Sequence, residues 1–292
     1  MDSESEAYAA PAGMHVGRVA LTVGSLDAVI PFYRDALGFA VERADRRARL
    51  RAGDRTRLVL VEDVDAPARP SEAAGLYHAA VRVPDRPALA AMLERIRESG
   101  HALSGASDHG VSEALYLRDP EGNGIEVYRD RPRAEWPRSP DGTPAMGTRP
   151  LDLSALAADA PDSRSGLSEG ADVGHVHLEV RDLDASEAFY AGTLGLAVQE
   201  RAERAVFAAA GGYHHHVACN TWQSRRAPAD GTARGLRWVE FAYPDAASVV
   251  AARERLPAER VVERDDGVVE VTDPDGIRLR LSVDADGDAG RA

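Results

Sequence analysis

The sequence predicts an α+β protein built from four βαβββ modules in two tandem domains. The first observation behind this prediction is an internal repeat. Residues 17–39 match residues 174–196, with Gly, Val, Leu-Asp, Phe-Tyr and Leu-Gly at the same offsets. Residues 75–85 likewise match 235–245, and residues 119–128 match 273–282. Such a repeat indicates a duplicated structural unit, and each half divides again into two units of about 50 residues.

The second observation is that each unit begins with an alternating apolar strand. Val19, Leu21 and Val23 recur at every second position, which predicts a strand. An amphipathic helix follows at 26–37 and ends before Gly38, a residue type that suits the left-handed position after a helix. Further strands complete each module. The modules span about residues 17–66, 75–131, 173–226 and 234–286.

The four modules group into two domains, 14–131 and 173–286. The segment between them, 132–172, contains six prolines among small and polar residues, which predicts a linker. Within it, residues 151–156 predict a short turn docked on a domain. A chain of 292 residues is long enough for two domains with separate cores.

Composition and charge narrow the classes of function. The net charge is −13 and every cation is an arginine, so nucleic acid is an unfavourable partner. No apolar run approaches the roughly 20 residues that span a bilayer, so no membrane partner is expected. The acidic start lacks the features of a secretory signal, and the single cysteine, Cys219, cannot form an internal disulfide. These features predict a cytoplasmic protein.

The repeated module resembles the vicinal oxygen chelate superfamily, which includes glyoxalase I, extradiol ring-cleaving dioxygenases, fosfomycin-modifying enzymes and bleomycin-binding proteins. The resemblance covers nearly the whole chain outside 132–172. It implies that two modules form a curved sheet around a metal ion, with ligands from the first and last strands of a module. The fold does not fix the chemistry, because the superfamily also includes metal-free binding proteins. Four modules could close both sheets within one chain, so a monomer and a homo-oligomer are both open.

The resemblance assigns candidate metal ligands position by position. The first-strand position falls, from module one to module four, on Arg18, His78, His175 and Trp238. The last-strand position falls on Glu126 in module two and Arg280 in module four, and near the histidines 214–216 in module three. We therefore expect modules two and three to share a metal site across the two halves, and modules one and four to form a vestigial one. Two histidines and one carboxylate form the triad that leaves open positions on iron(II).

Module two carries a longer motif at 108–126 that is similar to the extradiol dioxygenase signature. The matching residues are His109, Leu115, Tyr116, Asp119, Pro120, Gly122 and Glu126, and Ser107 departs from the pattern. The resemblance implies catalytic roles for His109 and Tyr116. A tyrosine hydroxyl at this place can hydrogen-bond a substrate oxygen.

Module three contains HHHVA at 214–218, which resembles the stretch that carries the acid–base histidine of extradiol enzymes. This match implies that His215 is the base, with His214 and His216 as alternatives in register. His216 could instead be a further metal ligand. His177 shares a strand face with His175 and is either a packing residue or a residue that surrounds the metal ligands.

The activity implied by the resemblance is that of an iron(II)-dependent extradiol dioxygenase of the catechol 2,3 type, which serves aromatic catabolism. A catechol and dioxygen are then the small-molecule partners, because iron(II) with three protein ligands can bind both. Manganese, nickel or zinc are alternative metals. The rival interpretations are a glyoxalase-like isomerase or lyase, with His216 as fourth ligand, and a non-catalytic small-molecule-binding protein.

Overall fold

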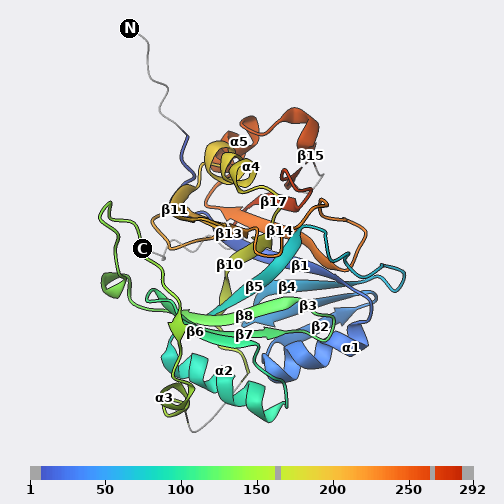
Figure 1. Cartoon of the computed structure of the whole chain (residues 1–292). Coiled ribbons are helices and arrows are strands. Elements are labelled where there is room, and N and C mark those ends of the chain that lie inside the picture. The colour runs from blue at the N-terminus through green and yellow to red at the C-terminus, as the bar shows by residue number, and fades with distance from the viewer. Residues whose placement is uncertain (1–7, 162–165, 264–266, 285–292) are drawn as a thin grey trace.

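The computed structural model describes residues 8–161, 166–263 and 267–284. Within these ranges the chain forms two curved sheets, one of eight strands and one of nine. Helices of the first half lie at one end of the molecule and helices of the second half at the other (Figure 1). No helix in this part of the chain is long and apolar enough to cross a membrane. The α+β class predicted from the repeat is confirmed.

The eight-stranded sheet combines module one with module four, in the order β15-β16-β17-β14-β1-β4-β3-β2. Module one supplies β1 (His15–Val23), β2 (Ala40–Ala44), β3 (Arg47–Ala52) and β4 (Arg55–Glu62). Module four supplies β14 (Gly235–Tyr243), β15 (Val261–Glu263), β16 (Val269–Thr272) and β17 (Arg278–Val283). The antiparallel pair β1 and β14 joins the two halves of the chain at the centre of the sheet.

The nine-stranded sheet combines module two with module three, in the order β11-β12-β13-β10-β5-β8-β7-β6-β9. Module two supplies β5 (Gly75–Val83), β6 (Gly105–Asp108), β7 (Ser112–Arg118) and β8 (Gly124–Asp130). Module three supplies β10 (Asp172–Glu179), β11 (Ala197–Ala202), β12 (Ala205–Ala209) and β13 (Val217–Asn220). The edge strand β9 (Arg149–Pro150) comes from the segment 132–172. The predicted pairing of modules two and three is therefore confirmed.

Short helices cover the sheets. They are α1 (Leu26–Pro31), α2 (Arg86–Glu98), α3 (Leu153–Ala157), α4 (Leu183–Glu187) and α5 (Ala246–Glu254), with π-helical turns at Phe32–Ala36 and Ala188–Thr193 and 3₁₀ turns at Arg133–Glu135 and Ala258–Arg260. α3 packs against α2, and its Leu156 is fully buried. The docked turn predicted at 151–156 is therefore a short helix.

Local sequence sets the ends of the first helix. The side chain of Ser25 accepts a hydrogen bond from the backbone N–H of Ala28, which satisfies a free donor at the start of α1. The predicted single helix over 26–37 is instead an α-helix that widens into a π-helical turn. Gly38 follows with a φ of +76°, as its residue type predicts.

Two buried hydrogen bonds tie consecutive modules together across the sheets. The hydroxyl of Tyr33 in module one donates to Oδ2 of Asp119 in module two at 2.9 Å. The hydroxyl of Tyr190 in module three donates to Oδ2 of Asp273 in module four at 3.0 Å. Each half of the sequence is thus held together through its helices and turns, while each sheet is shared between the halves.

Candidate metal centre

Three neighbouring strands bring the candidate ligands together around one alanine. In the order β10-β5-β8, Ala80 of β5 pairs with His175 on one side and with Glu126 on the other. His78 lies two residues earlier on β5 and therefore on the same face as Ala80. Because the alanine side chain is a single methyl group, the three larger side chains can meet above it. All three are buried, with exposed fractions of 5% or less.

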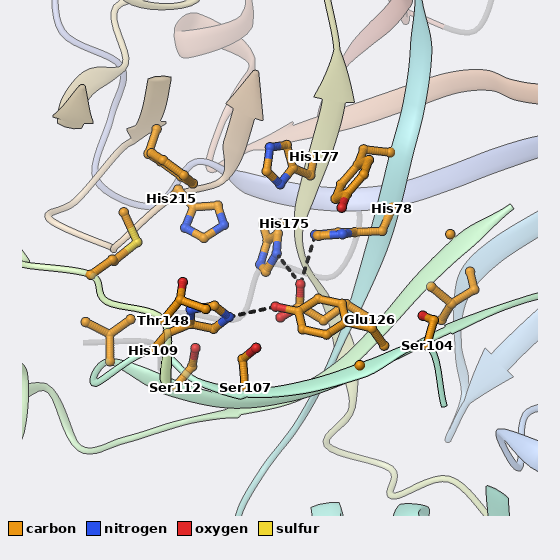
Figure 2. A pocket seen from close by; sticks show the side chains of 18 of the residues that line it. His78, Ser104, Ser107, His109, Ser112, Glu126, Thr148, His175, His177 and His215 are labelled. Carbon is orange, nitrogen blue, oxygen red and sulfur yellow. Dashed lines mark hydrogen bonds and ion pairs between the residues drawn. The ribbon is translucent and has the colours of Figure 1, made fainter. Parts of the chain in front are cut away.

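The donor atoms of these three residues converge (Figure 2). Oε2 of Glu126 lies 2.8 Å from Nε2 of His78 and 3.2 Å from Nε2 of His175. One ligand atom from each residue lies within 4.8 Å of the other two, and no other such group occurs among the residues that the structure describes. This spacing is compatible with one ion bound by all three, because metal–nitrogen and metal–oxygen bonds measure about 2.0–2.2 Å.

The electrostatics of the group suit a divalent metal. Burial lowers the pKa of His175 to about 4, so its imidazole is neutral at pH 7 and offers a lone pair. Burial acts to raise the pKa of Glu126, but attraction to His175 and His78 and the hydrogen bond with His175 outweigh it and hold the carboxyl ionised. Nε2 of His78 has no aligned hydrogen bond. Two imidazoles and one carboxylate fit a transition metal such as iron(II).

A cavity of about 580 Å³ opens beside the three candidate ligands. Three aromatic residues form one wall of the cavity, which we call the aromatic wall: Tyr77, Phe207 and Trp222. Hydroxyl-bearing residues line other parts of the cavity: Ser104, Ser107, Ser112 and Thr148. His177 also lines the cavity, with its ring 5.1 Å from that of His78. Of the two alternatives for His177, the structure therefore places it beside the candidate ligands.

The segment 132–172 contributes directly to this cavity. Met146, Gly147 and Thr148 line it, and the backbone N–H of Met146 donates to Glu200 across from it. The proline-rich composition of this segment predicted only a linker. Its contact with the cavity was missed, because no local sequence pattern indicates which surface a linker packs against. The aromatic wall was likewise missed, because strand alternation predicts that Tyr77 points away from the face of its neighbour His78, whereas the structure brings both to the cavity.

His109 and Tyr116 form a hydrogen-bonded pair at the edge of the cavity. Nδ1 of His109 lies 2.6 Å from the backbone oxygen of Gly147, which can only accept, so Nδ1 carries a proton. In the neutral ring, Nε2 then accepts from the Tyr116 hydroxyl at 2.7 Å. Burial, together with the charge of Glu126, raises the pKa of Tyr116, which keeps the phenol protonated. Tyr116 also pairs directly with Glu126 in the sheet, so it lies next to the candidate ligands.

The three histidines before β13 point to three different environments. His215 lines the cavity, and its ring centre lies 4.1 Å from that of His175. His214 is fully buried behind it, with Nε2 at 2.9 Å from Oδ1 of Asp130. Nδ1 of His216 accepts from the backbone N–H of Ala210, and its ring stacks on Tyr213. The structure does not bring His216 into the donor group, and we leave it out of the proposed metal ligands.

The sheet of modules one and four has a different set of side chains at the equivalent positions. Arg18 makes two hydrogen bonds of 2.6 Å with the carboxylate of Glu240. The guanidinium of Arg280 lies 4.3 Å from the ring centre of Trp238, and its Nε donates to Glu270 at 3.1 Å. Arginine cannot bind a cation, because it has no lone pair to offer.

Comparisons with known proteins agree with this fold. Residues 15–127 and 172–281 match the profile of the Glyoxalase/Bleomycin resistance protein/Dioxygenase superfamily. A Bacillus subtilis (strain 168) protein named catechol-2,3-dioxygenase is 40% identical over 268 residues, which cover 89% of this chain and 94% of that protein.

Two solved structures illustrate the range of similar folds. A putative dioxygenase from Bacillus subtilis subsp. subtilis str. 168 has a TM-score of 0.65 at 13% identity, over 94% of this chain and 87% of its own. Glyoxalase I from Zea mays has a TM-score of 0.55 at 16% identity, over 92% of both chains. At these identities the two structures establish a shared architecture.

Proposed function

Because the chain belongs to the glyoxalase/bleomycin resistance protein/dioxygenase superfamily, we propose that it is an iron(II)-dependent extradiol dioxygenase that opens the ring of a catechol. One observation carries this proposal. The buried group of two histidines and one carboxylate shares a single cavity with a protonated tyrosine, Tyr116, and a neutral histidine, His215. The 40% identity to a protein named catechol-2,3-dioxygenase supports the same activity.

His78, Glu126 and His175 are the residues that hold the metal in this proposal. Iron(II) held by these three residues would supply open positions for a catechol and dioxygen and the redox chemistry that their reaction needs. The negative charge of the Glu126 carboxylate would offset one of the two positive charges of the metal ion. Imidazole ligands are neutral and would offset none. A site with this net charge favours binding of the catechol as an anion, for which a nearby base must take the proton.

His215 is the proposed base. It faces the cavity, and its ring packs beside that of the ligand His175. Burial, reinforced by the neighbouring histidines, lowers the pKa of His215 well below its usual value, so the ring is neutral and able to accept a proton. The same ring can return that proton later in the reaction.

Tyr116 and the aromatic wall orient the substrate. While the hydroxyl of Tyr116 donates its hydrogen bond to His109, its oxygen keeps a lone pair. That oxygen can therefore accept a hydrogen bond from a substrate hydroxyl. Tyr77 and Trp222 lie with ring centres 5.3 Å apart and present apolar faces to the cavity. Such walls favour a planar aromatic ring and exclude water from it.

Oxygen uptake by the full chain tests this function. The protein is freed of metal, loaded anaerobically with iron(II), and mixed with catechol in an oxygen-electrode cell. We expect catechol-dependent uptake of about one dioxygen per catechol and a yellow ring-opened product. Zinc-loaded protein should be inactive, because zinc has no redox chemistry.

Two variants accompany the assay. His215→Ala should retain iron and lose about 10²–10⁴-fold in kcat, the usual contribution of general acid–base catalysis. Tyr116→Phe should lose less, because it keeps the ring and removes one hydrogen bond. If oxygen uptake stays at background while zinc- or nickel-loaded protein isomerises the thiol hemiadduct of an α-ketoaldehyde, the dioxygenase proposal is wrong and the chain is a glyoxalase-like isomerase.

A further inference from the structure

A chain of buried polar groups leads away from the cavity behind His215. Nδ1 of His215 lies 2.8 Å from Nδ1 of His214, and Nε2 of His214 lies 2.9 Å from Oδ1 of Asp130. Asp130 is at the end of β8, four residues after the ligand Glu126 and therefore on the same face of the strand. His214 is fully buried, and both of its ring nitrogens contact protein atoms.

The two oxygens of Asp130 have different partners. Oδ2 lies 3.1 Å from Nη1 of Arg82 and 3.0 Å from the hydroxyl of Tyr213, which also contacts Oδ1 at 3.3 Å. Arg82 is itself held from its other side by both oxygens of Asp172. A guanidinium can only donate, so the atom at the Oδ2 position must be an acceptor. Oδ1 is the oxygen left to face His214.

In two neutral rings, these contacts fix the tautomers of both histidines. A carboxylate oxygen only accepts, so Nε2 of His214 carries the proton that it donates to Asp130. A neutral imidazole has one N–H, so Nδ1 of His214 is then an acceptor and takes its hydrogen bond from Nδ1–H of His215. The remaining nitrogen of His215, Nε2, is thereby left without a proton, and His215 lines the cavity.

We propose that Asp130 and His214 are positioning residues that hold His215 in the tautomer whose unprotonated Nε2 serves the cavity. The chemical consequence rests on the proposed function, because only a substrate with an acidic hydroxyl needs this base. A histidine in the other tautomer presents N–H at the same place and cannot accept a proton there. The unprotonated nitrogen of His215 is therefore in place before the substrate binds. Neither histidine has to change its tautomer during the reaction.

The substitution Asp130→Asn should reverse both tautomers. The guanidinium of Arg82 requires an acceptor at the Oδ2 position, so the amide oxygen takes that place and the amide NH₂ faces His214. Nε2 of His214 then becomes an acceptor, its Nδ1 carries the proton, and Nδ1 of His215 must accept. The proton of His215 moves to Nε2. We expect kcat to fall by about 10²–10⁴-fold, as for other catalytic histidines held in the wrong tautomer, with little change in KM or in iron content.

The direct readout is the tautomer itself. Long-range ¹⁵N–¹H spectra of the full chain loaded with diamagnetic zinc distinguish a protonated from an unprotonated ring nitrogen at each histidine. We expect an unprotonated Nε2 at His215 in the wild-type chain and a protonated one in Asp130→Asn. The matched control is Asp172→Asn, which removes the same charge from the same arginine without touching His214. It should leave the His215 tautomer unchanged.

A second variant keeps the inference testable if Asp130→Asn folds poorly. His214→Asn places an amide oxygen near the position of Nδ1, where it can still accept from His215, whereas His214→Leu cannot. We expect kcat to be retained far better in the amide variant, and Asp130→Asn to have no further effect on kcat in that background.

Three results would overturn the inference. They are a protonated Nε2 at His215 in the wild-type chain, a tautomer that Asp130→Asn leaves unchanged, and a kcat loss of equal size in Asp172→Asn. A failure of the proposed function is distinguishable, because it shows as absent oxygen uptake by the iron-loaded wild-type chain while the tautomer still reverses in Asp130→Asn.

Discussion

Glu126→Gln tests the metal centre without any assumption about the reaction. The substitution keeps the shape of the side chain and removes the charge that lies within 3.2 Å of both imidazole nitrogens. Loss of a group that merely supports a metal ligand costs about 10–100-fold in metal affinity. We therefore expect the loss of a ligand itself to cost more than about 100-fold.

The effect can be measured as thermal stability. Metal at 100 times its Kd stabilises the folded state by about 2.7 kcal/mol. For 292 residues the entropy of unfolding is about 0.6 kcal/mol per kelvin, so the Tm should rise by about 4 °C. At the same metal concentration a variant with 100-fold weaker affinity gains about 0.4 kcal/mol, and its Tm should rise by less than about 1 °C.

The assay is a series of melting curves at increasing iron(II) or zinc concentration, each compared with the metal-free form of the same variant. Glu240→Gln is the matched control, because Glu240 is a similarly buried glutamate on the central strand of the other sheet and faces Arg18 instead of histidines. It should keep the full shift. If Glu126→Gln shows the same metal-dependent rise as the wild type, the proposed metal centre is refuted.

Three further outcomes are expected. His216→Gln should keep metal affinity within a few-fold by the same melting assay, because its Nδ1 is bound to backbone; a loss of affinity would favour a four-ligand centre. Tyr33→Phe should lower the free energy of unfolding in urea by about 1–2 kcal/mol, because buried Asp119 loses a donor; no change would mean that this tie is not structural. Burial acts to raise the pKa of Asp130, but hydrogen bonding to His214 and nearby positive charge lower it below 3.8. Its contribution to stability is thus present above about pH 4 and lost as the pH falls through the lower folded-state pKa, and acid titrations should show a shallower loss in Asp130→Asn.

Much of the fold was predictable because the information is local. Strand alternation at Val19, Leu21 and Val23, and a glycine after the helix at Gly38, follow from neighbouring residues and need no knowledge of the rest of the chain. The repeat then multiplies each local pattern. The widening of α1 into a π-helical turn was not predictable in this way, because it leaves the apolar spacing of the helix almost unchanged.

The pairing of modules two and three followed from the distribution of residue types. Histidines and a glutamate occupy ligand positions in those modules, whereas arginine and tryptophan occupy them in the others. The structure agrees, with His78, Glu126 and His175 in one group. The order of strands β10-β5-β8 supplies the reason, since it sets two of these residues on either side of Ala80.

The sequence by itself determined which residues are chemically able to bind a metal, take a proton or end a helix, because these properties belong to side chains and to short spacings. Only the tertiary structure decided which of the three adjacent histidines faces the cavity. It also decided that Met146 and Thr148 of the proline-rich linker line this cavity, and that Asp130 hydrogen-bonds His214. These relations depend on the register of strands that are distant in the chain and on the path of one loop. They are set by the packing of the whole molecule, which leaves no periodic trace in the residues concerned.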